Sequence, residues 1–183
     1  MRIAILDGEP DPASPFSAYL SSLAGHLASQ GHSVNRFELR TLDLKGCSGC
    51  FNCWVKTPGE CSKRDASADI CRSAIASDLL LLAAPMVMGF TSALLKGAVE
   101  QMLPILHPYF VVEGGEVHHR ARYAHYPRLG LLMGAGSDTD AEDIEIATTM
   151  WARMARDMKS RLVFAAVADR AAEEVADELA LAA

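Results

Sequence analysis

The alternation of short apolar runs with segments of helical periodicity is the strongest constraint on how this chain can fold. Apolar runs predict strands at 2–7, 33–39, 78–84, 129–133 and 161–168. Apolar residues at helical spacing predict helices at 15–30, 66–77, 92–103, 140–159 and 171–181. Strands that alternate with helices indicate crossover connections, which give a parallel sheet with helices on both faces. We therefore expect an α/β fold with a doubly wound, five-stranded parallel sheet in the order 2-1-3-4-5.

The chain of 183 residues is long enough for one ordinary domain, and neither an internal repeat nor an interdomain linker is visible. We expect a single domain over residues 1–183, with a cysteine-containing loop at 40–65 and an irregular insertion at 104–127. Within the insertion, 110–112 and 116–118 are expected to pair as a small hairpin across Gly114 and Gly115.

Composition and charge exclude several classes of function. Half of the residues are hydrophobic and the formal net charge is −6, so we expect no nucleic-acid partner. No block of Lys and Arg indicates a membrane surface, and the apolar run 79–88 is too short to span a bilayer. The first residues lack the features of a secretory segment, and the expected location is the cytoplasm.

Three loops are predicted to meet where the strands end. Ligands of doubly wound sheets bind beyond the carboxyl ends of the strands, and the N–H groups at helix N-termini favour anions. The loops 8–14, 85–92 and 134–137 each leave a strand, carry Gly or Pro, and lead into a helix. The cysteine loop follows the second strand, so we expect it at the same edge of the sheet.

Four of the five cysteines lie within fifteen residues, at Cys47, Cys50, Cys53 and Cys61. A C-x2-C-x2-C run can wrap thiolates around an iron–sulfur cluster, with Cys61 as a local fourth ligand. The same residues leave three alternatives open: a structural zinc site, redox-active thiols or a disulfide, and cysteines kept for packing. The fifth cysteine, Cys71, is expected to be a small apolar residue of a helix.

The chain resembles the flavodoxin-like NAD(P)H-dependent FMN reductases, and within them the iron–sulfur flavoproteins. The resemblance is carried by the first strand with Asp7-Gly8-Glu9-Pro10, the cysteine motif, and the segment 85–96, and it covers residues 1–105. It implies a flavin-dependent oxidoreductase or electron-transfer protein that holds FMN in the three loops. It also implies NAD(P)H as a transient electron donor, a small-molecule or protein redox partner, a [4Fe–4S] cluster on the four cysteines, and a homodimer or homotetramer.

The residues implied to hold the flavin are those of the three loops and the two helix starts beside them. They are Gly8, Glu9, Pro10, Ser14, Ser17, Pro85, Met86, Val87, Met88, Gly89, Ser92, Gly134, Ala135 and Gly136.

The first loop departs from the family pattern. Where the family usually has Gly-Ser-Pro-Arg, this chain has Gly8-Glu9-Pro10-Asp11, with two carboxylates where the FMN phosphate is expected to approach. Like charges at such separations repel. The alternative reading is a flavodoxin-fold relative that has lost FMN and acts as a metal-binding or scaffold partner protein.

Histidines gather in the insertion at His107, His118, His119 and His125. No carboxylate lies at a recognised metal-ligand spacing from them, so we expect a surface or oligomer contact rather than a metal site.

Overall fold

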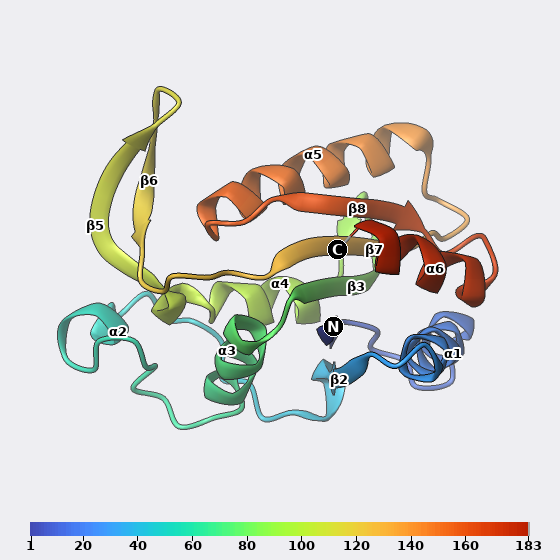
Figure 1. The fold of residues 1–183 in the computed structure, drawn as a ribbon, viewed down its shortest axis with the longest axis horizontal. Helices are drawn as coiled ribbons and strands as arrows, with labels where there is room; N and C mark the ends of the chain where they lie inside the picture. Colours follow the sequence, from blue (N-terminus) through green and yellow to red (C-terminus); the bar gives the residue numbers. More distant parts are fainter. Residues whose placement is uncertain (183) are drawn as a thin grey trace.

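A computed structural model describes residues 1–182 of the chain. Five parallel strands form the sheet in the order β2-β1-β3-β7-β8, which confirms the predicted order. Their bounds are β1 Arg2–Asp7, β2 Ser33–Glu38, β3 Leu79–Val87, β7 Arg128–Gly134 and β8 Leu162–Val167. The arrows of β3, β7 and β8 point the same way in Figure 1, toward the side where α1 and α6 lie.

Alternate residues of the central strands point into two separate cores, because successive side chains of a strand face opposite sides of the sheet. Ile3 and Ile5 join one core, whereas Ala4 and Leu6 join the other. Since both faces are covered, the strands are apolar throughout rather than alternating with polar residues.

Helices α1 (Pro15–Ser29) and α6 (Ala172–Ala182) cover one face of the sheet, and they contribute Leu20, Leu23 and Leu179 to its core. The other face is covered by α3 (Ser67–Ala76), α4 (Ala93–Glu100) and α5 (Ala141–Asp157).

Local signals explain where three of these helices begin. Ser14 caps α1 by accepting the Ser17 N–H, and Pro15 follows at the first helical position. Ser92 caps α4, and Asp140 forms a capping box with Asp143 at the start of α5.

The insertion is more regular than expected. Strands β5 (Leu106–Glu113) and β6 (Glu116–Ala121) form an antiparallel hairpin over most of it, after the 3-10 turn η2 (Leu103–Ile105). The predicted hairpin is confirmed and is longer, whereas the expected irregular segment is wrong. The sequence predicted a shorter hairpin because His107 and Pro108 interrupt the strand pattern. The pairing register shifts at these residues.

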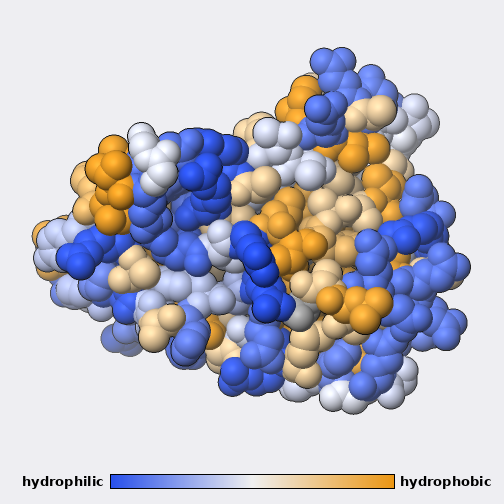
Figure 2. Space-filling view, turned by 45° about the horizontal axis from the view of Figure 1, so that its top comes forward, coloured by the Kyte–Doolittle hydropathy of each residue, from blue (hydrophilic) through white to orange (hydrophobic). Residues whose placement is uncertain are grey.

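The hairpin extends away from the sheet and its helices (Figure 1) and exposes several large apolar side chains: Tyr109, Phe110, Val112 and Val117. Figure 2 shows that apolar residues interrupt the hydrophilic surface of the molecule.

The long loop after β2 contains two short helical turns, η1 (Leu39–Thr41) and α2 (Asn52–Val55). Among the described residues, no helix is both long and apolar enough to cross a membrane.

Candidate functional site

The three predicted loops meet at the carboxyl edge of the sheet. The Gly8 N–H donates to the Ala83 carbonyl at 2.7 Å, and Ser92 Oγ donates to the Gly8 carbonyl at 2.6 Å. Pro85 of β3 lies in register with Gly134 of β7. The sequence therefore predicted their proximity correctly, because the carboxyl ends of neighbouring parallel strands share one edge. That these residues bind a cofactor stays a prediction.

The first loop is packed closely against the second. A Cβ on Gly8 would lie 2.8 Å from Leu95 Cβ and 2.9 Å from Ser92 Oγ, so no larger residue fits without movement. Pro10 is exposed and Ser14 is half-buried, whereas Ser17 is buried. Glu9 is also buried, with 4% of its surface exposed, and its carboxylate accepts the Asp11 N–H at 2.8 Å.

The second loop is mostly extended backbone closed by a tight turn. Strand β3 continues to Val87 and pairs with β4 (Phe90–Thr91), so only Met88 and Gly89 form the connection. Both have positive φ, 51° and 77°, as two-residue hairpin turns require. The turn leaves Val87 and Met88 exposed and Met86 buried.

The third loop joins β7 to α5. Gly134 lies against the Phe16 ring of α1, and a Cβ there would lie 2.9 Å from Phe16 Cγ. Ala135 and Gly136 are exposed, and the Gly136 N–H donates to Thr139 Oγ1 at 3.0 Å. A small exposed backbone stretch therefore follows β7 at the same sheet edge as the Val87–Met88 turn.

Beneath the first loop lies a buried ion cluster that sequence reasoning missed. Asp7 is fully buried, and its Oδ2 accepts from Arg36 Nη2 at 2.6 Å and from Arg40 Nη1 at 3.3 Å. Arg40 also donates to the Glu9 carbonyl at 3.2 Å and pairs with Glu38. The signal that could have revealed it is Asp7 at the end of an apolar strand, since a buried carboxylate requires a partner.

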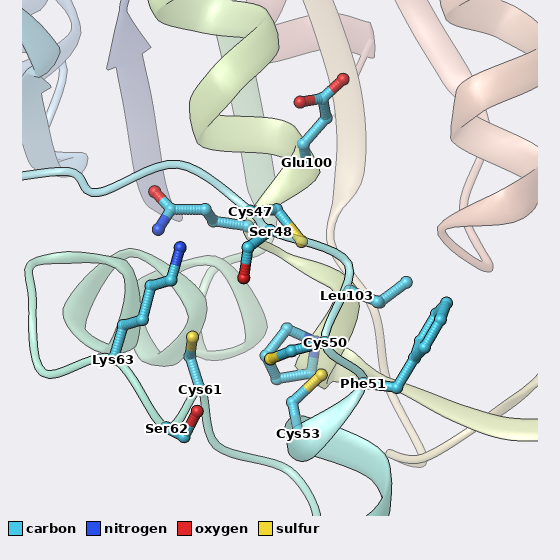
Figure 3. A pocket seen from close by; sticks show the side chains of 12 residues that line it. Cys47, Ser48, Cys50, Phe51, Cys53, Cys61, Ser62, Lys63, Glu100 and Leu103 are labelled. Carbon is cyan, nitrogen blue, oxygen red and sulfur yellow. The ribbon is translucent and has the colours of Figure 1, made fainter.

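The four motif cysteines line one pocket between the long loop and the end of α4 (Figure 3). Its lining residues are Cys47, Ser48, Cys50, Phe51, Cys53, Cys61, Ser62, Lys63, Glu100, Gln101, Leu103 and Pro104. Among residues 1–182, no three Cys, His, Asp or Glu side chains lie close enough together to hold a metal ion. The pocket thus collects the thiols without forming a closed coordination site.

The environments of the cysteines differ. Cys50 is exposed, and the Asn52 backbone N–H contributes most to lowering the pKa of its thiol. Cys53 is buried, and burial raises the pKa of its thiol, with further contributions from Cys61 and Cys47. Burial also raises the pKa of Cys71 to about 12, so that thiol stays protonated. Cys71 is half-buried on α3, and its Sγ faces the Gln101 carbonyl at 3.9 Å.

The cysteine loop begins at the edge of the three loops, where Arg40 donates to the Glu9 carbonyl, but its four cysteines lie elsewhere, and for them the expectation of a shared edge is wrong. Ser92 at the start of α4 contacts the first loop, whereas Glu100 and Gln101 at its end line the cysteine pocket. The eight residues of α4 correspond to about 12 Å of helix between them. Figure 1 shows α2 of the cysteine loop on the side of the molecule away from α1.

Asp65 fixes the cysteine loop to the rest of the domain. Its carboxylate accepts from the Lys45 N–H at 3.0 Å, from Ser67 Oγ at 2.6 Å and from Gln101 Nε2 at 3.0 Å. Burial opposes the charged form, but the hydrogen bonds from Ser67, Lys45 and Gln101 outweigh it and lower the pKa of Asp65 to about 2.

Aromatic rings join the cysteine loop to the hairpin. Trp54 stacks on Phe51 with 5.3 Å between ring centroids and contacts the His119 ring at 4.8 Å, and His119 in turn contacts Phe110 at 4.9 Å. Trp54 Nε1 donates to the Leu106 carbonyl at 3.0 Å. The cysteine loop and the hairpin therefore pack as one unit.

The histidines of the hairpin do not all lie at the surface. His118 is buried, with 6% of its surface exposed, and its ring nitrogens pair with Asp157 and Glu116 at 2.8 and 3.1 Å. The expected surface position is therefore wrong for His118, because α5 approaches the hairpin and covers it.

Comparison with known proteins identifies relatives of this chain. The NADPH-dependent FMN reductase family matches residues 1–131. An iron–sulfur flavoprotein of Archaeoglobus fulgidus is 29% identical over 107 residues, which is 58% of this chain and 48% of that protein. The match thus spans about half the length of this relative.

Solved structures share the fold at low sequence identity. An FMN-dependent NADH-azoreductase from Bacillus anthracis superposes with a TM-score of 0.69 at 13% identity, covering 98% of this chain and 100% of that one. An NAD(P)H:quinone oxidoreductase from Methanothermobacter marburgensis gives a TM-score of 0.65 at 18% identity, covering 98% and 95%. The sheet order, the three loops at its carboxyl edge and the match over residues 1–131 together establish that the chain belongs to the NADPH-dependent FMN reductase family, a family of oxidoreductases.

Proposed function

We propose that the chain is an NAD(P)H-dependent flavin oxidoreductase or electron-transfer protein, with a flavin at the three loops and a separate thiol centre at the cysteine pocket. The main support is the meeting of the three loops at one sheet edge, held by the bond between Ser92 and Gly8. Family membership and the iron–sulfur flavoprotein relative support the same reaction class. A bound flavin supplies hydride and electron transfer, while the protein supplies position and electrostatics.

The chain suits the two ends of FMN unequally. The exposed apolar side chains of Val87 and Met88, at the same sheet edge as the small residues Ala135 and Gly136, suit a flat ring system. At the first loop, by contrast, the carboxylate of Glu9 already accepts the Asp11 N–H that an incoming phosphate would need. The phosphate end of FMN does not fit this loop as it stands.

The cysteine pocket suits a soft metal or an iron–sulfur cluster by its donor set. Cys47, Cys50, Cys53 and Cys61 offer four thiols, and Lys63 lines the same pocket. A nearby cation favours thiolates. Binding requires the loop from Cys47 to Cys61 to close, since its side chains are not gathered around one point. A [4Fe–4S] cluster there would supply single-electron transfer; a zinc ion would supply stability alone.

A small-molecule or protein redox partner, assembly as a homodimer or homotetramer, and a cytoplasmic location remain parts of this proposal.

A second candidate is a family member that has lost FMN and works as a metal-binding or scaffold partner protein. The specific observation that favours it is the engagement of the first-loop amides by Glu9 and Asp11.

One anaerobic preparation separates the two candidates. Absorption spectra and titrations with riboflavin and FMN test the first, which requires a dissociation constant below about 10 µM for at least one of them. Failure of both flavins to bind at that level would leave the second candidate. Iron, acid-labile sulfide and zinc are measured in the same sample, and about four iron atoms and four sulfides per chain are expected for the cluster.

A further inference from the structure

The first loop and the start of α1 have almost no free backbone donors. Among residues 8–17, Pro10, Pro12 and Pro15 carry no N–H, and six of the other seven amides donate within the protein. The six are those of Gly8, Glu9, Asp11, Ala13, Ser14 and Ser17. Within the described part of the chain, only the Phe16 amide of this stretch has no hydrogen-bond acceptor.

Three carboxylates accept hydrogen bonds from three of these six amides. Asp7 Oδ1 accepts the Glu9 N–H at 2.9 Å, Glu9 Oε1 accepts the Asp11 N–H at 2.8 Å, and Asp11 Oδ1 accepts the Ala13 N–H at 2.9 Å. Each carboxylate thus bonds the amide two residues further on, as Asx-type turns do. An oxyanion bound by backbone N–H groups is the chemistry that a phosphate would require here. The loop supplies that oxyanion from its own side chains.

The charges near the loop do not favour a second anion. The guanidinium groups of Arg36 and Arg40 are engaged by the buried Asp7, and Arg40 also pairs with Glu38. Among the described residues, the carboxylates of Glu9 and Asp11 have no cation within 4.0 Å. A phosphate carrying about −1.5 to −2 charges would meet two uncompensated negative charges.

We propose that Glu9 and Asp11 occupy the anion position of the first loop, so that the site binds a flavin without a terminal phosphate in preference to FMN. This inference rests on the proposed flavin function and specifies its ligand. Burial of Glu9 gives its carboxylate a fixed position, whereas Asp11 is exposed and adds a weaker, salt-dependent repulsion.

The test compares dissociation constants of riboflavin and FMN, measured by quenching of flavin fluorescence with the full chain. The wild-type protein is expected to bind riboflavin at least about tenfold more tightly than FMN, which corresponds to about 1.4 kcal/mol. Glu9→Gln keeps the side-chain length and an oxygen for the Asp11 N–H but removes the charge. The variant should divide the ratio of the FMN dissociation constant to the riboflavin dissociation constant by about ten. Its dissociation constant for riboflavin should stay within about twofold of the wild-type value.

Glu145→Gln is the matched control, because it makes the same substitution at an exposed position of α5. The ratio should not change in this variant. Tighter wild-type binding of FMN than of riboflavin, or the same ratio in wild type and Glu9→Gln, overturns the inference while the proposed function stands.

A second readout does not depend on flavin. Inorganic phosphate is compared with chloride at equal ionic strength, and the melting temperature is recorded. We expect phosphate to stabilise Glu9→Gln more than the wild type, since the variant's first loop carries one negative charge less. If neither flavin binds, the proposed function and the flavin preference both fail, and this readout tests whether Glu9 occupies the anion position. Equal stabilisation of both proteins by phosphate, or none of either, then overturns the inference.

Discussion

At the scale of single residues, Asp65 joins three segments that are distant in the sequence. It receives N–H and O–H groups from Lys45, Ser67 and Gln101, and its lowered pKa of about 2 records how strongly they favour its charge. Such a depressed pKa contributes stability that is complete above the unfolded pKa of about 4 and is lost as the pH falls through about 2.

We therefore predict that Asp65→Asn lowers the free energy of unfolding by about 1 to 2 kcal/mol at pH 7, after allowance for partial solvent access. Urea unfolding at several pH values measures this, and the difference from wild type should shrink steadily below about pH 4. Asp43→Asn is the control in the same loop, because Asp43 is exposed and lies 3.7 Å from Lys45. A cost that does not change with pH would contradict the assigned role of the charge.

The cysteines differ in reactivity at the same scale. Cys50 is exposed with a lowered pKa, whereas the pKa of Cys71 is raised to about 12. Since the thiolate is the reactive form, iodoacetamide at pH 7 should label Cys50 first in the metal-free chain. Cys71 should remain unlabelled until the protein is unfolded. Peptide mass spectrometry over time checks this order, and equal rates at the two positions would show that α3 does not shield Cys71.

At the scale of elements, two glycines in and beside α4 offer a matched pair. Gly89 has a φ of 77°, and a Cβ there would lie 2.8 Å from Asp143 Oδ1, whereas a Cβ on Gly97 would meet nothing within 4 Å. Gly89→Ala should lower the free energy of unfolding by about 1 to 2 kcal/mol, because an L-residue is strained at positive φ. Gly97→Ala should raise it by about 0.5 to 1 kcal/mol, because alanine favours helix. Urea unfolding of both variants measures the two changes in the free energy of unfolding. A change of the same sign in both variants would refute the assigned turn.

At the scale of the whole molecule, the two candidate sites lie at opposite ends of α4 and share no lining residue among those described. Substitutions that are far apart and share no contacts act independently. Cys61→Ser should therefore remove most of any bound iron or zinc and leave the dissociation constant for flavin within about twofold. Metal analysis and flavin titration of the same sample test this, with Cys71→Ser as the control. A loss of flavin affinity of about tenfold or more would mean that the two sites are coupled.

The sequence by itself determined the strands, their order and the meeting of the three loops. These follow from local hydrophobic periodicity and from the right-handed crossovers that parallel strands require. Both depend on residues that are close together in the sequence. It also indicated that Cys47, Cys50, Cys53 and Cys61 would lie in one region of the fold, because they are close together in the sequence.

Only the tertiary structure decided where the cysteine pocket lies and which way Glu9 points. The path of a long loop depends on distant contacts, here Asp65 with Gln101 and Trp54 with Leu106, and no local pattern encodes them. Glu9 in a loop sequence suggests exposure, yet its carboxylate is buried because it bonds the Asp11 amide above the Asp7 ion cluster. Long-range hydrogen bonds and the pairing of buried charges determine the position of the cysteine pocket and the orientation of Glu9. Both kinds of interaction arise only when the chain has folded.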